Sequence, residues 1–98
     1  MTDLYLEQKY IDFIKETIYS VLEHAHIYIF GSRVQGNAQE FSDVDIALDT
    51  KNVIDIKDIL TLKSIFRNST FPYKVDIIDI NSTDKKFLKI IESDLYEI

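Results

Sequence analysis

The sequence lacks the residues that build several kinds of special framework. Its 98 residues include no cysteine, no tryptophan, only two glycines and one proline. Without cysteine there can be no disulfides, thiolate metal sites or cysteine nucleophiles. No stretch approaches the roughly 18 consecutive apolar residues that a membrane-spanning helix needs. Residues 1–7 carry two acids and no Lys or Arg, unlike a secretory signal, so we expect a cytoplasmic protein outside the membrane.

Positive charge is also scarce. There are 17 acidic and 11 basic residues, which gives a net charge of -6. Such a balance repels the phosphate backbone, so stable nucleic-acid binding is not expected. It suits a basic protein partner or a site rich in carboxylates that binds a divalent metal. The length and the 46% hydrophobic content predict one globular domain over residues 1–98.

Hydrophobic periodicity predicts an α/β fold in which helices pack on a small mixed β-sheet. The expected order is α-β-α-β-α-β-α, with Ser82 or Thr83 as the cap of the last helix. Apolar β-branched runs predict strands at 27–30, 44–48 and 73–80. The helices are expected at 4–24, in a short turn-and-helix segment at 31–38, at 55–67, and after residue 83.

The helical spacing of apolar residues also predicts which side chains face the core. For the first helix, Ile14 and Ile18 belong to that face. For the later helices, the predicted core residues are Ile56, Ile59, Leu60, Phe66, Phe87, Leu88, Ile91 and Leu95.

The pair Gly31-Ser32 directly follows the first predicted strand. Glycine permits a sharp turn and lets a ligand approach the backbone, and serine adds a hydroxyl. Taken alone, such a pair is usually only a turn. Gly31 and Gly36 have the spacing of a Walker A loop, but Asn37 and Ala38 stand where that motif needs Lys and Ser or Thr. A Walker-type NTPase is therefore excluded.

Asp43 and Asp45 flank Val44 at the start of the second predicted strand. Residues two apart in a strand point to the same face, so the two carboxylates are expected side by side. Their repulsion is relieved when a divalent cation binds, and Mg²⁺ prefers carboxylate and phosphate oxygens. The plainer interpretation is a pair of solvated acids at a strand end.

A third acid lies within the apolar run Val75–Ile80. An ionised acid there needs compensation, and Asp76 can supply the third carboxylate if the second and third strands are neighbours. Asp79 points to the opposite face by strand parity, so only one of the two can join the cluster. We predict Asp76, because Asp79 lies near the strand end, where water can solvate it.

The combination is far more specific than its parts. Gly31-Ser32, ten intervening residues and then Asp43-Val44-Asp45 resemble the signature of the DNA polymerase β-like nucleotidyltransferase superfamily. The short length is similar to that of its minimal nucleotidyltransferases (MNT). The resemblance covers residues 27–80 firmly and the last helix loosely.

This resemblance implies roles for individual residues. Asp43, Asp45 and Asp76 would be the catalytic and metal-binding acids, holding two Mg²⁺ ions. Gly31 and Ser32 would bind the β- and γ-phosphates of ATP. Asp76 would also orient or deprotonate the attacking hydroxyl. Many members of the superfamily have Ala, or Arg followed by Ala, after Gly-Ser, whereas this chain has Arg33-Val34. Two roles are open for Arg33. It is expected either to contact a phosphate of the nucleotide or to point outward into solvent.

The resemblance also implies an activity and a partner. MNT proteins are antitoxins of HEPN/MNT toxin–antitoxin pairs, and they transfer AMP from ATP to a tyrosine of the HEPN ribonuclease toxin, with which they form a hetero-oligomer. Two other functions fit the same residues. One is an antitoxin that neutralises its toxin by binding alone. The other is an aminoglycoside-type adenylyltransferase that modifies a small molecule.

Overall fold

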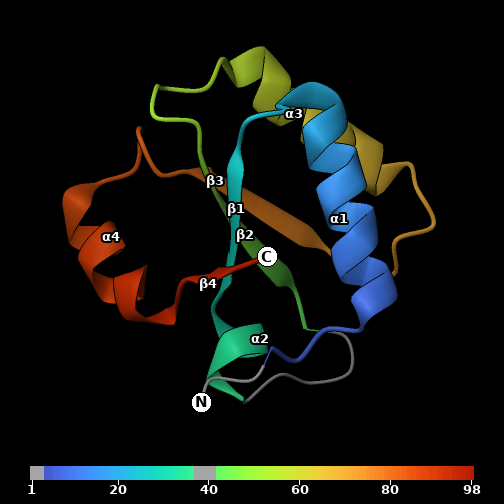
Figure 1. Cartoon of the computed structure of the whole chain (residues 1–98), viewed down its shortest axis with the longest axis horizontal. Helices are drawn as coiled ribbons and strands as arrows, with labels where there is room; N and C mark the ends of the chain where they lie inside the picture. Colours follow the sequence, from blue (N-terminus) through green and yellow to red (C-terminus); the bar gives the residue numbers. More distant parts are fainter. Residues whose placement is uncertain (1–3, 37–41) are drawn as a thin grey trace.

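The computed structural model describes residues 4–36 and 42–98. Their core element is a four-stranded sheet with the strand order β3-β2-β1-β4 (Figure 1). Strand β1 is antiparallel to both β2 and β4, whereas β2 and β3 are parallel. The strands are β1 (His26–Phe30), β2 (Val44–Asp49), β3 (Val75–Asp79) and β4 (Tyr96–Glu97). The helices are α1 (Gln8–Val21), α2 (Ser32–Gln35), α3 (Ile56–Arg67) and α4 (Lys85–Ile91), with a 3₁₀ turn, η1 (Glu92–Asp94), after α4.

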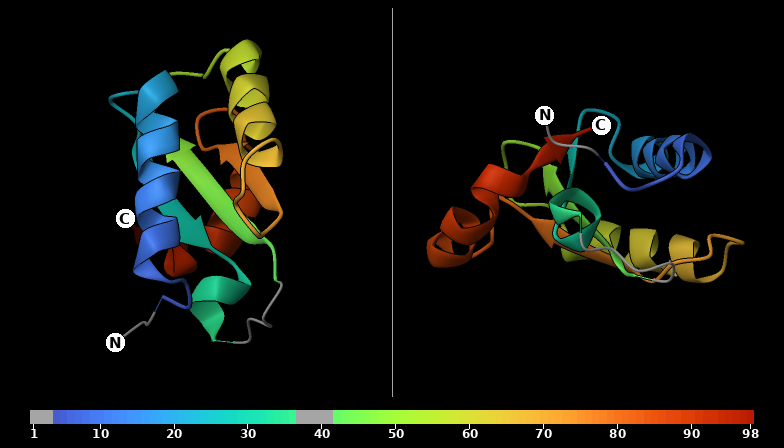
Figure 2. Two further views of the ribbon diagram at one scale, coloured as in Figure 1. Left: turned by 90° about the vertical axis from the view of Figure 1, so that its right-hand side faces the viewer. Right: turned by 90° about the horizontal axis from the view of Figure 1, so that it is seen from below.

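Helices α1 and α3 cover one face of the sheet, and α4 lies on the other (Figure 2). Alternate residues of β2 explain this arrangement, since Val44, Ile46 and Leu48 are fully buried under α1 and α3. Helix α1 contributes Ile14 and Ile18, as its periodicity predicts. This large cluster supplies most of the hydrophobic stabilisation of the fold.

The face below α4 has a smaller apolar cluster of Phe30, Ala47 and Ile91. This smaller cluster lies on the same side of the sheet as the side chains of Asp45 and Asp76. Strand parity places both acids on the face of Ala47 and away from the large core. Helix α4 therefore covers part of this face. The acids lie further along, at the end of the sheet where β1 ends and β2 and β3 begin.

The predicted mixed sheet is confirmed, and so is the order of the predicted elements. The prediction missed β4, which pairs with β1 at Tyr28 with Glu97 and at Ile29 with Tyr96. A two-residue strand carries no periodic signal, so its pairing alone defines it. The predicted segment 31–38 contains α2, and its last two residues lie outside the described ranges.

Some predicted core residues are wrong. Ile56 and Leu60 are 64% and 57% exposed, because α3 turns Ile59, Leu62 and Phe66 toward the sheet instead. In α4, Phe87 is 39% exposed while Ile91 is buried.

The prediction that Ser82 or Thr83 caps α4 is also wrong. Asp84 caps the helix, accepting a hydrogen bond from the Lys86 amide. Ser82 and Thr83 instead donate to the carbonyl of Asp79 and close the turn after β3. None of the helices within 4–36 and 42–98 has the length and apolar character needed to span a membrane.

Candidate functional site

The two parallel strands of the sheet bring Asp45 and Asp76 together. These residues are direct register partners on β2 and β3, and adjacent strands lie about 4.8 Å apart. On the other side of β2, Asp45 is opposite Phe30, the last residue of β1. Asp43 precedes Asp45 by two residues and is exposed, as is Asp76. The prediction that β2 and β3 are neighbours is confirmed, and Asp76 lies beside Asp45.

Electrostatics link the three acids. The pKa of Asp45 is raised above its usual value, first by burial and then by the negative charges of Asp76 and Asp43. Asp45 is half-buried, and no hydrogen bond or ion pair to it is seen within the described residues. Its charge is therefore uncompensated by the residues that the structure describes, which is the situation that a bound cation relieves.

The turn after β1 is shaped around Asp45. Gly31 has φ +80°, a conformation that side chains other than glycine rarely adopt. A Cβ atom at this position would lie 2.5 Å from Oδ2 of Asp45. The amides of Val34 and Gln35 then bond to the Gly31 carbonyl and start α2, which begins at Ser32. Ser32 thus follows the residue that packs against Asp45, at the same end of the sheet.

Arg33 does not fit the predicted role of a phosphate contact. Its side chain is 5% exposed, so the outward-facing alternative is wrong. Nη1 donates to the Tyr5 carbonyl at 3.0 Å and Nη2 to the Ser42 carbonyl at 2.7 Å. The guanidinium also lies 4.2 Å from the ring centre of Tyr73. Arg33 therefore ties the segment before α1 to the segment before β2.

We expect Arg33→Met to destabilise the fold without weakening nucleotide binding. Losing two charge-assisted hydrogen bonds in a buried setting should lower the free energy of unfolding by about 2–4 kcal/mol. Urea denaturation measures this loss, and titration calorimetry with ATP at low temperature measures the affinity of the folded protein. Unchanged stability together with weaker ATP binding would restore the phosphate-contact role.

Asp79 is structural, and the predicted reason for setting it aside is wrong. It is buried at 7% exposure rather than solvated. Its carboxylate accepts from the amide of Ile54 at 2.8 Å and from the amide of Asn81 at 3.0 Å. The first bond fixes the segment between β2 and α3, and the second fixes the turn after β3, on the face opposite to Asp76.

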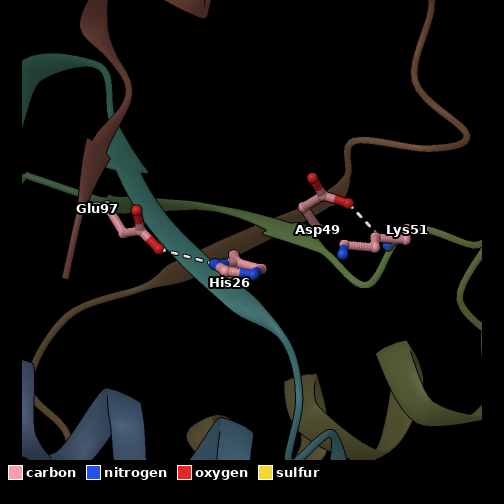
Figure 3. A network of polar contacts seen from close by, with 4 residues as sticks. All are labelled: His26, Asp49, Lys51 and Glu97. Atoms are coloured by element: carbon pink, nitrogen blue, oxygen red, sulfur yellow. Dashed lines mark hydrogen bonds and ion pairs between the residues drawn. The ribbon is translucent and has the colours of Figure 1, made fainter.

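The far end of the sheet holds acids in a contrasting environment (Figure 3). Nδ1 of His26 lies 2.9 Å from Oε2 of Glu97, which links β1 to β4. Asp49 accepts from the side chain of Asn81 and from the amide of Lys51, and these bonds lower its pKa. Asp49 and Asp45 share a strand and a face, yet among the residues in 4–36 and 42–98 only Asp49 has partners that stabilise its charge.

The raised pKa of Asp45 predicts a pH-dependent effect of Asp45→Asn on stability. A folded-state pKa above the unfolded value gives stability that is present at low pH and lost as pH rises through the folded pKa. Near neutral pH, the charged Asp45 therefore costs stability, and Asn should raise the Tm by up to about 3 °C. At about pH 3 the gain should vanish. Thermal scans in a chelator across this range test the sign, and a lower Tm at neutral pH would contradict it.

A pocket of about 310 Å³ opens beside Asp76, at the outer edge of β3. Sequence reasoning missed it, although Lys63 and Arg67 are one helical turn apart and Lys74 precedes Asp76 by two residues. The pocket is lined by Lys63, Phe66, Arg67, Tyr73, Lys74, Val75 and Asp76.

Comparison with known proteins places this geometry in a family. The model of the polymerase beta nucleotidyltransferase family matches residues 12–96. A curated relative, the probable protein adenylyltransferase MntA of Haemophilus influenzae, is 32% identical over 78 residues, which cover 80% of this chain and 68% of that protein.

Solved structures agree on the fold. A mutant of the toxin–antitoxin MntA-HpeT matches with a TM-score of 0.73 at 20% identity, over 94% of this chain and 72% of the other. A toxin–antitoxin with AMP-PNP matches with a TM-score of 0.67 at 24% identity, over 85% and 70%. The tri-AMPylated Shewanella oneidensis HEPN toxin in complex with MNT antitoxin matches with a TM-score of 0.60 at 20% identity, over 88% of this chain and 69% of the other. With the family match spanning most of the chain, the resemblance seen in the sequence is confirmed: the protein belongs to the polymerase beta nucleotidyltransferase family.

Proposed function

We propose that this chain transfers AMP from ATP to a tyrosine hydroxyl of a HEPN toxin, and so acts as its antitoxin. The observation that carries the proposal is the register pair of Asp45 and Asp76, with the Asp45 carboxylate packed against the main chain of Gly31. The relative named as a protein adenylyltransferase supports AMP transfer. The solved complexes with AMP-PNP and with an AMPylated HEPN toxin support the nucleotide and the acceptor.

The acids are suited to hold Mg²⁺. Asp43, Asp45 and Asp76 offer the carboxylate oxygens that this ion prefers, and two ions would offset part of the negative charge of three acids and a triphosphate. Among the described residues, no three His, Asp or Glu side chains already stand close enough to share an ion. Asp43 and Asp76 are exposed, so rotation of their side chains toward Asp45 is cheap. When bound, Mg²⁺ would neutralise the negative charge of the acids and phosphates.

The residues of this chain then have distinct tasks. The main chain at Gly31 and the hydroxyl of Ser32 would hold the β- and γ-phosphates. Asp76 would orient the tyrosine hydroxyl and accept its proton. The tyrosine oxygen forms a bond to the α-phosphorus, and the bond from that phosphorus to pyrophosphate breaks. Most of the rate gain in this scheme comes from positioning and charge compensation, so no nucleophilic side chain of the enzyme is needed.

Intact-mass spectrometry tests the proposal. The purified chain is incubated with ATP, Mg²⁺ and the HEPN protein encoded by the neighbouring gene. We expect the HEPN protein to gain the mass of one or more AMP units on a tyrosine. A tight complex without any mass gain would instead support an antitoxin that acts by binding alone.

A further inference from the structure

The pocket beside Asp76 combines an apolar floor with a concentration of positive charge. Phe66 is buried and Tyr73 and Val75 are half-buried, while Lys63, Arg67 and Lys74 contribute three cations. Among the described residues that line the pocket, the one acid is Asp76. This is an unusual surface for a chain with a net charge of -6.

The side chains of the three cations have no ion pair with any residue that the structure describes. Within the described residues, ion pairs involve Lys9, His24 and His26, and none includes Lys63, Arg67 or Lys74. Solvated surface cations are common, but these three surround a concave site with apolar walls. Such walls focus the electric field and raise the local concentration of anions.

The position of the pocket indicates which substrate it faces. Across the sheet, the order is the Gly31-Ser32 turn after β1, then Asp45 on β2, then Asp76 on β3, then the pocket. If the phosphates of ATP lie at the turn, the pocket is at the outer edge of β3, beyond the acids in the strand order. Three of its lining residues come from α3, on the face opposite to the Asp76 side chain, so an acceptor that approaches Asp76 around this edge would meet the pocket.

We propose that this pocket binds acidic side chains of the acceptor protein that flank its target hydroxyl. The inference rests on the proposed function and adds a feature of the substrate. A carboxylate held by Lys63 and Arg67 would place the acceptor segment beside Asp76 and would offset its repulsion from the acids of the site.

The test compares two double variants that remove the same charge. Lys63→Gln with Arg67→Gln alters the pocket, whereas Lys57→Gln with Lys85→Gln alters the first turns of α3 and α4, which follow the far ends of β2 and β3. Binding of the HEPN protein is measured by calorimetry at low and high salt. The KM values for the HEPN protein and for ATP are measured by AMP transfer.

For the pocket variant, we expect binding of the HEPN protein to weaken about tenfold, with a matching rise in its KM and a shallower salt dependence. The KM for ATP and the behaviour of the control variant should not change. Unaltered binding would overturn the proposal, as would a rise in the KM for ATP alone, which would assign the pocket to the nucleotide. If the wild type binds the HEPN protein but transfers no AMP, the proposed function fails. The comparison of the two double variants in binding of the HEPN protein then still tests the proposal for the pocket.

Discussion

Asp45→Asn is expected to lower AMP transfer by roughly a thousandfold or more. Asp45 is the central member of the acidic cluster, since it is the register partner of Asp76 and follows Asp43 by two residues. Its pKa responds to both neighbours, so its carboxylate is the one that links them. Asparagine keeps the shape but removes the charge that would hold the metal. Steady-state transfer to the HEPN protein measures the loss.

Asp49→Asn is the matched control for this substitution. Asp49 lies on the same strand and the same face as Asp45, but it is paired with Asn81 and the amide of Lys51 at the far end. Its replacement should leave the rate of transfer within about twofold and cost some stability above its lowered pKa. Equal losses from both substitutions would show that charge on the strand, not the site, controls activity.

Gly31→Ala is expected to abolish transfer and to destabilise the fold by about 2–4 kcal/mol. Two effects combine, because φ of +80° strains alanine and the new Cβ would lie 2.5 Å from Oδ2 of Asp45. The carboxylate has to move, which displaces it from the position that the turn and β3 define. Urea denaturation and the transfer assay measure the two effects on the same preparation.

Gly36→Ala separates the backbone strain from the contact with Asp45. Gly36 has a similar φ of +86°, but the nearest atoms to its Cβ would be those of the Tyr5 ring, at 3.4 Å. We expect a stability loss of about 1–2 kcal/mol and near-normal transfer by the folded protein. If Gly31→Ala is no worse than Gly36→Ala in the transfer assay, the packing of Asp45 against the turn has no catalytic role.

The sequence allowed the sheet and its acidic end to be predicted because both follow from local patterns. Alternation of Val44, Ile46 and Leu48 with acids indicates a strand with one buried face. The same parity places Asp43 with Asp45 and separates Asp76 from Asp79. The spacing from Gly31-Ser32 to Asp43 then identifies the family, which the family match confirms.

The errors arose where contacts distant in the sequence decide the outcome. Arg33 is buried because carbonyls of Tyr5 and Ser42, which lie 28 and 9 residues away, accept its hydrogen bonds. Asp79 is buried because an amide 25 residues away donates to it. No local pattern reports such partners. The packing of Asp45 against Gly31 was missed for the same reason, because it depends on the register of β1 and β2.

Titration of Mn²⁺, a paramagnetic substitute for Mg²⁺, tests most directly whether Asp45 and Asp76 form one site with the nucleotide. Electron paramagnetic resonance follows free Mn²⁺ in the presence of a non-hydrolysable ATP analogue. We predict that the wild type and Asp49→Asn bind the ion, and that Asp45→Asn and Asp76→Asn each lose nearly all of that binding. Binding by Asp76→Asn that equals the wild type would show that the two carboxylates do not act together.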